Sequence, residues 1–314
     1  MSRSATAAVG TPPPTLKLLF KYFSGSACRS GSKFHHGWVH SALPFPRIAR
    51  PVLLLLIWPL LVVGATAPAD LNPAWTSLAN SRPKDVLRSI DGNETSRPAR
   101  LARAAAWMSL QPATDANLRA ADAIFTELAA GDDEIAAEAG YLRARLQQLH
   151  YSQPDYARAA ELYRELFARQ PQSHWAQLGL VKLAMLELYV LPAVTPAGGD
   201  RLAPAEALLA QIHETLLQRD LHLQIGQAGV ALNQPLGRFL PHLVAADRIG
   251  GISGTAREDL IVQIGVLSLR AGLPAQAKEY FEKYLHEYPT NIRAWTVRQK
   301  LPEAERQLAP EGRP

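Results

Sequence analysis

The chain has little of what metal-binding, disulfide-linked or catalytic proteins use. Its 314 residues include one cysteine, Cys28, so no internal disulfide can form. The nine histidines show neither H-E-x-x-H nor another ligand pair at helical spacing. The GGISG run at 250–254 is one residue short of the G-x-S-x-G pattern of a serine nucleophile. The sequence therefore predicts no metal, no cofactor and no catalytic residue, and a chain that is not an enzyme.

Acidic residues are missing from the first 50 positions. Residues 1–50 carry seven Lys or Arg and no Asp or Glu, whereas the rest of the chain has 26 basic and 28 acidic residues. The pI of 9.4 is therefore a property of this leader. Binding of nucleic acid needs Lys and Arg gathered to neutralise phosphates, and the remaining residues are nearly neutral. We expect no nucleic-acid partner.

A hydrophobic run long enough to span a bilayer is also absent. Residues 52–63 are twelve apolar residues, about 18 Å as a helix against a hydrocarbon core of about 30 Å. Arg47 and Arg50 precede the run and small residues follow it, which is typical of a signal peptide. A retained short anchor at 51–67 is the alternative. A mitochondrial transit peptide is a third interpretation, but a uniformly apolar run argues against an amphipathic helix.

What the chain does have is a helical hairpin near its C-terminus. An apolar run at helical spacing starts at Leu260 and follows a T-x-x-E capping box formed by Thr255 and Glu258. Gly272 suits a left-handed residue after the first helix, and Pro274 suits the first turn of the second. The pattern predicts two antiparallel helices with one buried face.

The spacing in the second helix of this hairpin resembles that of the tetratricopeptide repeat (TPR). Ala277-x3-Phe281 with Pro289 eight residues later is the family's second-helix pattern. Gly265 lies where the family places a small residue so that the two helices pack closely. Trp295 lies in the position of the next repeat's Trp. The first-helix motif is degenerate, because Ile261 and Ile264 replace its Trp and Leu.

The same pattern recurs upstream. Ala159-x3-Tyr163 is followed by Pro171, Trp175-x2-Leu178-Gly179 resembles a first-helix signature, and Ala121-x3-Phe125 resembles another second helix. First helices are expected at about 101–111, 139–152, 173–190 and 256–270. The resemblance implies an all-α, right-handed solenoid of antiparallel helical hairpins.

The remaining segments complete the predicted organisation. A Pro/Gly insertion at 191–203 separates the helices of the third hairpin, whose second helix is expected to continue to about 218. Two helices are expected in 220–254, the second kinked or broken at Pro241, and Pro302 is expected to end the last helix. The predicted domains are a basic leader (1–50), a signal or anchor (51–67), a tether with one short helix (68–99), the repeat domain (100–302) and a tail (303–314).

The family resemblance implies a groove, lined by first helices, that grips an extended peptide or a partner's helix. The positions carried over to this chain are Arg103, Tyr141, Gln148, Tyr151 and Arg270, with Leu180, Leu183, Val262 and Val266 beside them. Burial of the four aliphatic residues by neighbouring helices is an equal alternative. The paired Lys/Arg/Asn clamp of the family's carboxylate binders is not evident in the sequence. The 191–203 insertion is either the rim of the partner site or a tolerated loop.

The sequence thus favours a non-enzymatic scaffold of the bacterial cell envelope that binds a protein partner. Arg exceeds Lys 25 to 8 and Ala is abundant, which is typical of a GC-rich bacterial genome. The predicted location is periplasmic or membrane-anchored. Two alternatives stay open: a regulatory or assembly-helper subunit of a membrane complex, and an enzyme whose groups converge from scattered positions. The lack of any catalytic motif counts against the second.

Overall fold

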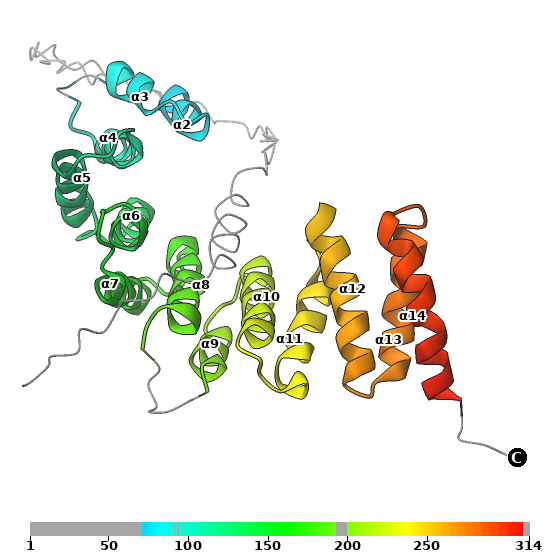
Figure 1. The fold of residues 1–314 in the computed structure, drawn as a ribbon. Helices are drawn as coiled ribbons and strands as arrows, with labels where there is room; N and C mark the ends of the chain where they lie inside the picture. Colours follow the sequence, from blue (N-terminus) through cyan, green and yellow to red (C-terminus); the bar gives the residue numbers. More distant parts are fainter. Residues whose placement is uncertain (1–70, 91, 93, 193–199, 310–314) are drawn as a thin grey trace, which may run out of the picture. The chain divides into compact units, whose positions relative to one another are not determined.

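A computed structural model describes residues 71–90, 92, 94–192 and 200–309, and the signal or anchor predicted at 51–67 lies outside these residues. The described residues form thirteen helices and no strand. In chain order the helices are α2 Asn72–Ala79, α3 Pro83–Ser89, α4 Arg97–Ser109, α5 Asp115–Leu128, α6 Glu134–Leu149, α7 Tyr156–Arg169, α8 His174–Tyr189, α9 Leu202–Leu209, α10 Thr215–Ala231, α11 Leu236–Ile249, α12 Gly254–Arg270, α13 Pro274–Glu287 and α14 Ile292–Leu308. Consecutive helices pack on each other throughout Leu71–Pro314 (Figure 1). The predicted all-α, solenoid-like stack is therefore confirmed.

The four first helices expected from the repeat pattern are present as α4, α6, α8 and α12; three start two to five residues earlier than expected, and α8 starts one residue later. Each Ala-x3-aromatic pair lies on a second helix and is fully buried: Ala121 with Phe125, Ala159 with Tyr163, and Ala277 with Phe281. The alanine leaves room for the neighbouring helix, and the ring four residues later lies on the same helix face. This pairing is the repeated unit of the core.

Glycines set the closest approaches between helices. A Cβ on Gly265 of α12 would lie 2.6 Å from Phe281 Cε1 on α13, so the predicted small-residue role of Gly265 is confirmed. A Cβ on Gly229 of α10 would lie 2.2 Å from Phe239 Cβ, and one on Gly226 would lie 2.3 Å from Leu243 Cδ2. The helices at 220–254 match no repeat motif. They nevertheless pack as a hairpin, because glycines on α10 again let the neighbouring helix approach closely.

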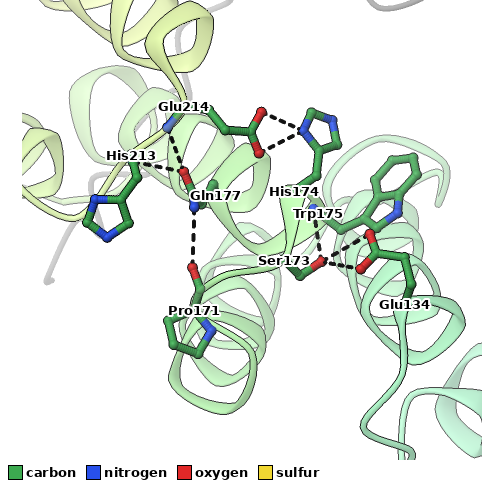
Figure 2. A network of polar contacts seen from close by, with 8 residues as sticks. All are labelled: Glu134, Pro171, Ser173, His174, Trp175, Gln177, His213 and Glu214. Carbon is green, nitrogen blue, oxygen red and sulfur yellow. Dashed lines mark hydrogen bonds and ion pairs between the residues drawn. The ribbon is translucent and has the colours of Figure 1, made fainter.

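The second helix expected in the third hairpin is broken, which corrects the prediction of one helix continuing to about 218. Helix α9 ends at Leu209 and α10 begins at Thr215. The buried Gln177 side chain on α8 holds the intervening turn: its Oε1 accepts from the backbone N–H of His213 at 2.8 Å and of Glu214 at 3.0 Å (Figure 2). These amides are the donors that a continuous helix would bond internally, so Gln177 stabilises the break.

Three further expectations are corrected. Helix α14 runs through Pro302, and α11 runs through Pro241, so neither helix is broken at its proline, while a kink at Pro241 stays a prediction; both prolines are exposed. Helix α12 begins at Gly254 with Ser253 as its N-cap, so Thr255 lies inside the helix and the predicted capping box is wrong. The segment 68–99 contains two helices, α2 and α3, in place of one. Val86 of α3 is fully buried, and both helices contact α4.

No helix in the described part of the chain is both long enough and apolar enough to cross a membrane.

Candidate functional site

The first helices form a row of their own. Helix α4 packs on α6, α6 on α8 and α8 on α10, in addition to the contacts between chain neighbours. The row extends to α12 through a hydrogen bond from Gln227 Nε2 to Gln263 Oε1 at 2.9 Å. We call one side of this row the first-helix face. It comprises Glu138, Tyr141, Arg145 and Gln148 on α6, Trp175, Leu178, Lys182 and Tyr189 on α8, and Asp220, Leu223, Gln224 and Gln227 on α10.

Helical spacing explains why these residues share a side. On α8 the intervals of three, four and seven residues bring Trp175, Leu178, Lys182 and Tyr189 onto one stripe. All four are half-buried, whereas most other α8 residues are buried by neighbouring helices. The stripe is therefore the side of α8 on which a partner would find accessible side chains.

Two cations of this face, Arg145 and Lys182, have no bonded carboxylate among the described residues, and they are near enough for the charge of Arg145 to act on Lys182. Arg145 Nη1 donates to Gln148 Oε1 at 3.1 Å, and Tyr163 Oη donates to the same oxygen at 2.8 Å. The ammonium of Lys182 makes no hydrogen bond within the described residues. Burial, and secondly the charge of Arg145, lower the pKa of Lys182 to about 8, while Asp220 opposes the shift. Asp220 itself is bonded by Arg219, at 2.6 Å. The face thus holds excess positive charge in a partly desolvated position.

Two buried glutamine amides beside these cations lack partners. Gln148 Nε2 and both polar atoms of Gln224 have no hydrogen-bond partner among the described residues, although the two side chains are 0% and 1% exposed. An unpaired buried polar group costs about 1–3 kcal/mol, so its retention calls for a reason. Gln224 lies one turn beyond Asp220 on the same side of α10.

An aromatic pair borders the cations. Tyr141 stacks at a tilt on Trp175, with ring centroids 5.3 Å apart, and lies 6.1 Å from the ring of Tyr163. Glu138, one turn before Tyr141, makes no hydrogen bond within the described residues. Its pKa is raised to about 7, first by burial and then by the charge of Glu134. This end of the face therefore carries less negative charge near neutral pH than its sequence indicates.

The helix N-termini at this end are tied together by the contacts of Figure 2. Ser173 Oγ caps α8, and it also donates to Glu134 Oε2 of α6 at 3.1 Å. His174 Nδ1 lies 2.8 Å from Glu214 Oε2 at the start of α10. Together with the hydrogen bonds of Gln177, these contacts link α6, α8 and α10 and fix the positions of the three helices relative to one another. The network positions the first-helix face and is not itself an open site.

The structure places the predicted partner-binding residues in different environments. Tyr141 is 7% exposed and Gln148 is fully buried, so both lie beneath the accessible surface of the face. Arg103 and Tyr151 are half-buried, and Arg270 is exposed at the end of α12. Leu180 and Leu183 are buried in the core, as the alternative for them predicted, whereas Val262 and Val266 are half-buried. The binding role of these residues stays a prediction.

Sequence reasoning missed Arg145, Lys182 and Gln224. Arg145 and Lys182 come together only because α6 packs on α8. One signal was present: Lys182 is the one charged residue in the otherwise apolar stretch LGLVKLAML. Residues 193–199 of the insertion predicted to rim the site lie outside the described residues, and Asp200 at its end pairs with Arg238 at 2.5 Å.

A separate groove of about 540 Å³ lies between α11 and the α12–α13 turn. It is mainly apolar, and its lining comprises Leu236, Gly237, Leu240, Pro241, Val244, Arg248, Ala271, Leu273 and Gln276. The groove has one cation, Arg248, and none of the unpaired buried amides. It is a weaker candidate than the first-helix face for recognising a charged peptide.

Comparison with known proteins finds no matching family model and no matching curated protein.

Proposed function

We propose that the chain is a non-enzymatic scaffold of the tetratricopeptide class that binds a protein partner through the first-helix face. The excess positive charge at Arg145 and Lys182 carries this proposal, because both side chains are half-buried on the accessible sides of α6 and α8 and neither is bonded to a carboxylate in the described residues. Support for the class comes from the buried Ala-x3-aromatic pairs and from the contact of Gly265 with Phe281. The partner segment is an extended peptide with an acidic side chain.

The contacts of such a peptide follow from the face. A partner carboxylate accepts from Lys182 and Arg145, both of which are half-buried and reachable from solvent. An apolar side chain one or two residues from the acid packs on Trp175 and Leu178, which are half-buried and next to the cations. Of the positions expected from the repeat resemblance, Arg103 on α4 and Arg270 at the end of α12 lie farther along the same row, whereas Tyr151 follows the end of α6 and packs towards α5.

Random peptides displayed on phage and selected on the full chain in detergent should be enriched in Asp and Glu. Lys182→Gln and Arg145→Gln should each weaken the selected peptides about 10- to 100-fold, since a charged hydrogen bond contributes about 1.5–3 kcal/mol. Affinity should fall from pH 7 to pH 9, because the Lys182 ammonium, with its pKa near 8, loses its proton. Lys182→Arg should flatten this pH dependence.

Arg248→Gln is the matched control, because it removes the cation of the α11 groove and leaves the first-helix face intact. Selected peptides without acidic residues, or peptides that bind both face variants as well as the parent chain, would contradict the proposal. Loss of binding in Arg248→Gln alone would move the binding site to the groove. Circular dichroism melts of each variant separate lost binding from lost folding.

We further propose that the scaffold acts outside the bacterial cytoplasm, exported or anchored by residues 51–67. The basic, acid-free leader followed by an apolar run supports this location. Alkaline phosphatase fused after Pro314 should be active in a bacterial host, and a fluorescent protein that folds only in the cytoplasm should stay dark there. The opposite pattern would exclude export. Mass spectrometry of the mature N-terminus then distinguishes a cleaved signal from a retained anchor.

A further inference from the structure

Two histidines face each other between α10 and α11. His222 on α10 and His242 on α11 have their Nδ1 atoms 2.9 Å apart, and their ring centroids are separated by 5.1 Å. The approach of α10 to α11 is fixed by Gly226 against Leu243 and Gly229 against Phe239. Because the backbone sets this separation, the two imidazoles are held together independently of their own hydrogen bond.

A carboxylate orients the second ring from outside the pair. Glu206 Oε1 of α9 lies 3.4 Å from His242 Nε2, and Arg238 holds Glu206 through bonds of 3.0 and 2.5 Å. A carboxylate at Nε2 favours the proton on that nitrogen and leaves the lone pair on Nδ1, which faces His222. Carboxylates that fix a histidine in this way are the usual outer partners of metal-bound imidazoles.

We propose that His222 and His242 bind a transition-metal ion through their Nδ1 atoms, with Glu206 as the outer partner. Two nitrogens about 2.0–2.1 Å from one metal are about 2.9 Å apart at a right angle and about 3.3 Å apart at a tetrahedral angle. The observed separation fits the right angle preferred by Cu²⁺ and Ni²⁺, and nitrogen ligands exclude Mg²⁺ and Ca²⁺. Binding requires the proton between the two Nδ1 atoms, which belongs to His222, to move to His222 Nε2, so that both rings stay neutral and both Nδ1 lone pairs face the metal.

The state of the rings agrees with such a site. Burial, and then the neighbouring imidazole, lower the pKa of His222. Burial also lowers the pKa of His242, against the opposing effect of Glu206. A lowered pKa favours the neutral form of an imidazole, which is the form that binds a metal. No group of three or more His, Cys, Asp or Glu in the described residues can hold a metal. The pair thus supplies two ligands, and water or a partner completes the shell.

Isothermal titration of the full chain with NiCl₂ at pH 7.5 tests the proposal. His35, His36 and His40 are replaced by serine in every sample, because these leader histidines offer competing ligands. One Ni²⁺ should bind per chain and raise the melting temperature. His222→Gln and His242→Gln should abolish both effects, and Glu206→Gln should weaken binding about 10- to 100-fold. Mg²⁺ should have no effect.

His213→Gln is the matched control, since His213 is exposed at the start of α10 and lies outside the pair. Failure to bind Ni²⁺, or equal binding by the His222→Gln chain, would overturn the proposal. Should the glutamine variants unfold, the Cu²⁺ complex of the parent chain decides. Its electron paramagnetic resonance spectrum must show coupling to two imidazole nitrogens, and a spectrum with one or none excludes the site. None of these outcomes depends on peptide binding by the first-helix face.

Discussion

Phe281→Ala should lower the free energy of unfolding by about 3–5 kcal/mol, the usual cost of removing a fully buried phenylalanine. The ring is 0% exposed on α13 and fills the space that Gly265 leaves on α12. Because the glycine has no side chain that could collapse into the cavity, the loss should lie in the upper part of this range. Urea unfolding followed by circular dichroism measures the loss.

The loss should be local, because each hairpin of a repeat array contacts only its neighbours. Amide hydrogen exchange should therefore speed up most in α12 and α13, less in α11 and α14, and not in α4 to α7. Trp295→Ala is the control: this ring is 68% exposed on α14, and its removal should change stability by less than about 0.5 kcal/mol. A loss below about 1 kcal/mol for Phe281→Ala would mean that the ring does not fill the core of this hairpin.

The architecture was predictable from sequence because its core obeys local spacing. The alanine and the aromatic residue of each second helix are four positions apart, so one turn of helix places them on the same side whatever else the chain does. Gly265 faces the ring of Phe281 within a hairpin of two short helices, which keeps the two residues close in sequence. Fold class follows from such short-range patterns.

The predictions of helix ends and breaks failed where the local structure depends on a distant residue or on contact with solvent. The break at 210–214 depends on Gln177, more than thirty positions earlier and buried on another helix. The helices that run through Pro241 and Pro302 continue because both prolines are exposed, so water can bond the carbonyl that each proline leaves unpaired. A local sequence motif predicts neither which distant residue will supply a hydrogen bond nor which side of a helix will face solvent.

The candidate site was less predictable than the fold for the same reason. Positions carried over from the repeat pattern included Tyr141 and Gln148, which line the floor of the first-helix face, but the pattern says nothing about charge. Arg145 and Lys182 are 37 positions apart and meet only through the packing of α6 on α8. The lysine at position 182 could be noticed in the sequence, because a charged residue is unexpected in an apolar helix. Its proximity to Arg145 could not be predicted, because it depends on how the two helices pack.

Asp247→Ala should destabilise the chain by about 3–5 kcal/mol, the loss expected when one member of a buried ion network is removed. The Asp247 side chain is 2% exposed on α11. Its oxygens accept from Lys283 Nζ at 2.6 Å and Tyr280 Oη at 3.0 Å on α13, and Arg257 Nη1 of α12 lies 3.4 Å away. One carboxylate therefore joins three helices, and thermal and urea unfolding should both report its loss.

Two further variants identify the cause of this loss. Asp247→Asn keeps an acceptor for Tyr280 and removes only the charge, so it should cost less than Asp247→Ala. The triple variant Asp247→Leu, Lys283→Met and Tyr280→Phe removes the carboxylate together with its two nearest donors, and Arg257 keeps its bonds to Glu287. Replacing a complete buried network by apolar residues of similar size is often neutral or stabilising. Its stability should therefore exceed that of Asp247→Ala, because no lysine or tyrosine hydroxyl is left without its acceptor. If the triple variant is instead the least stable, Asp247 and its partners contribute net attraction, and the loss in Asp247→Ala is not the cost of an unpaired charge.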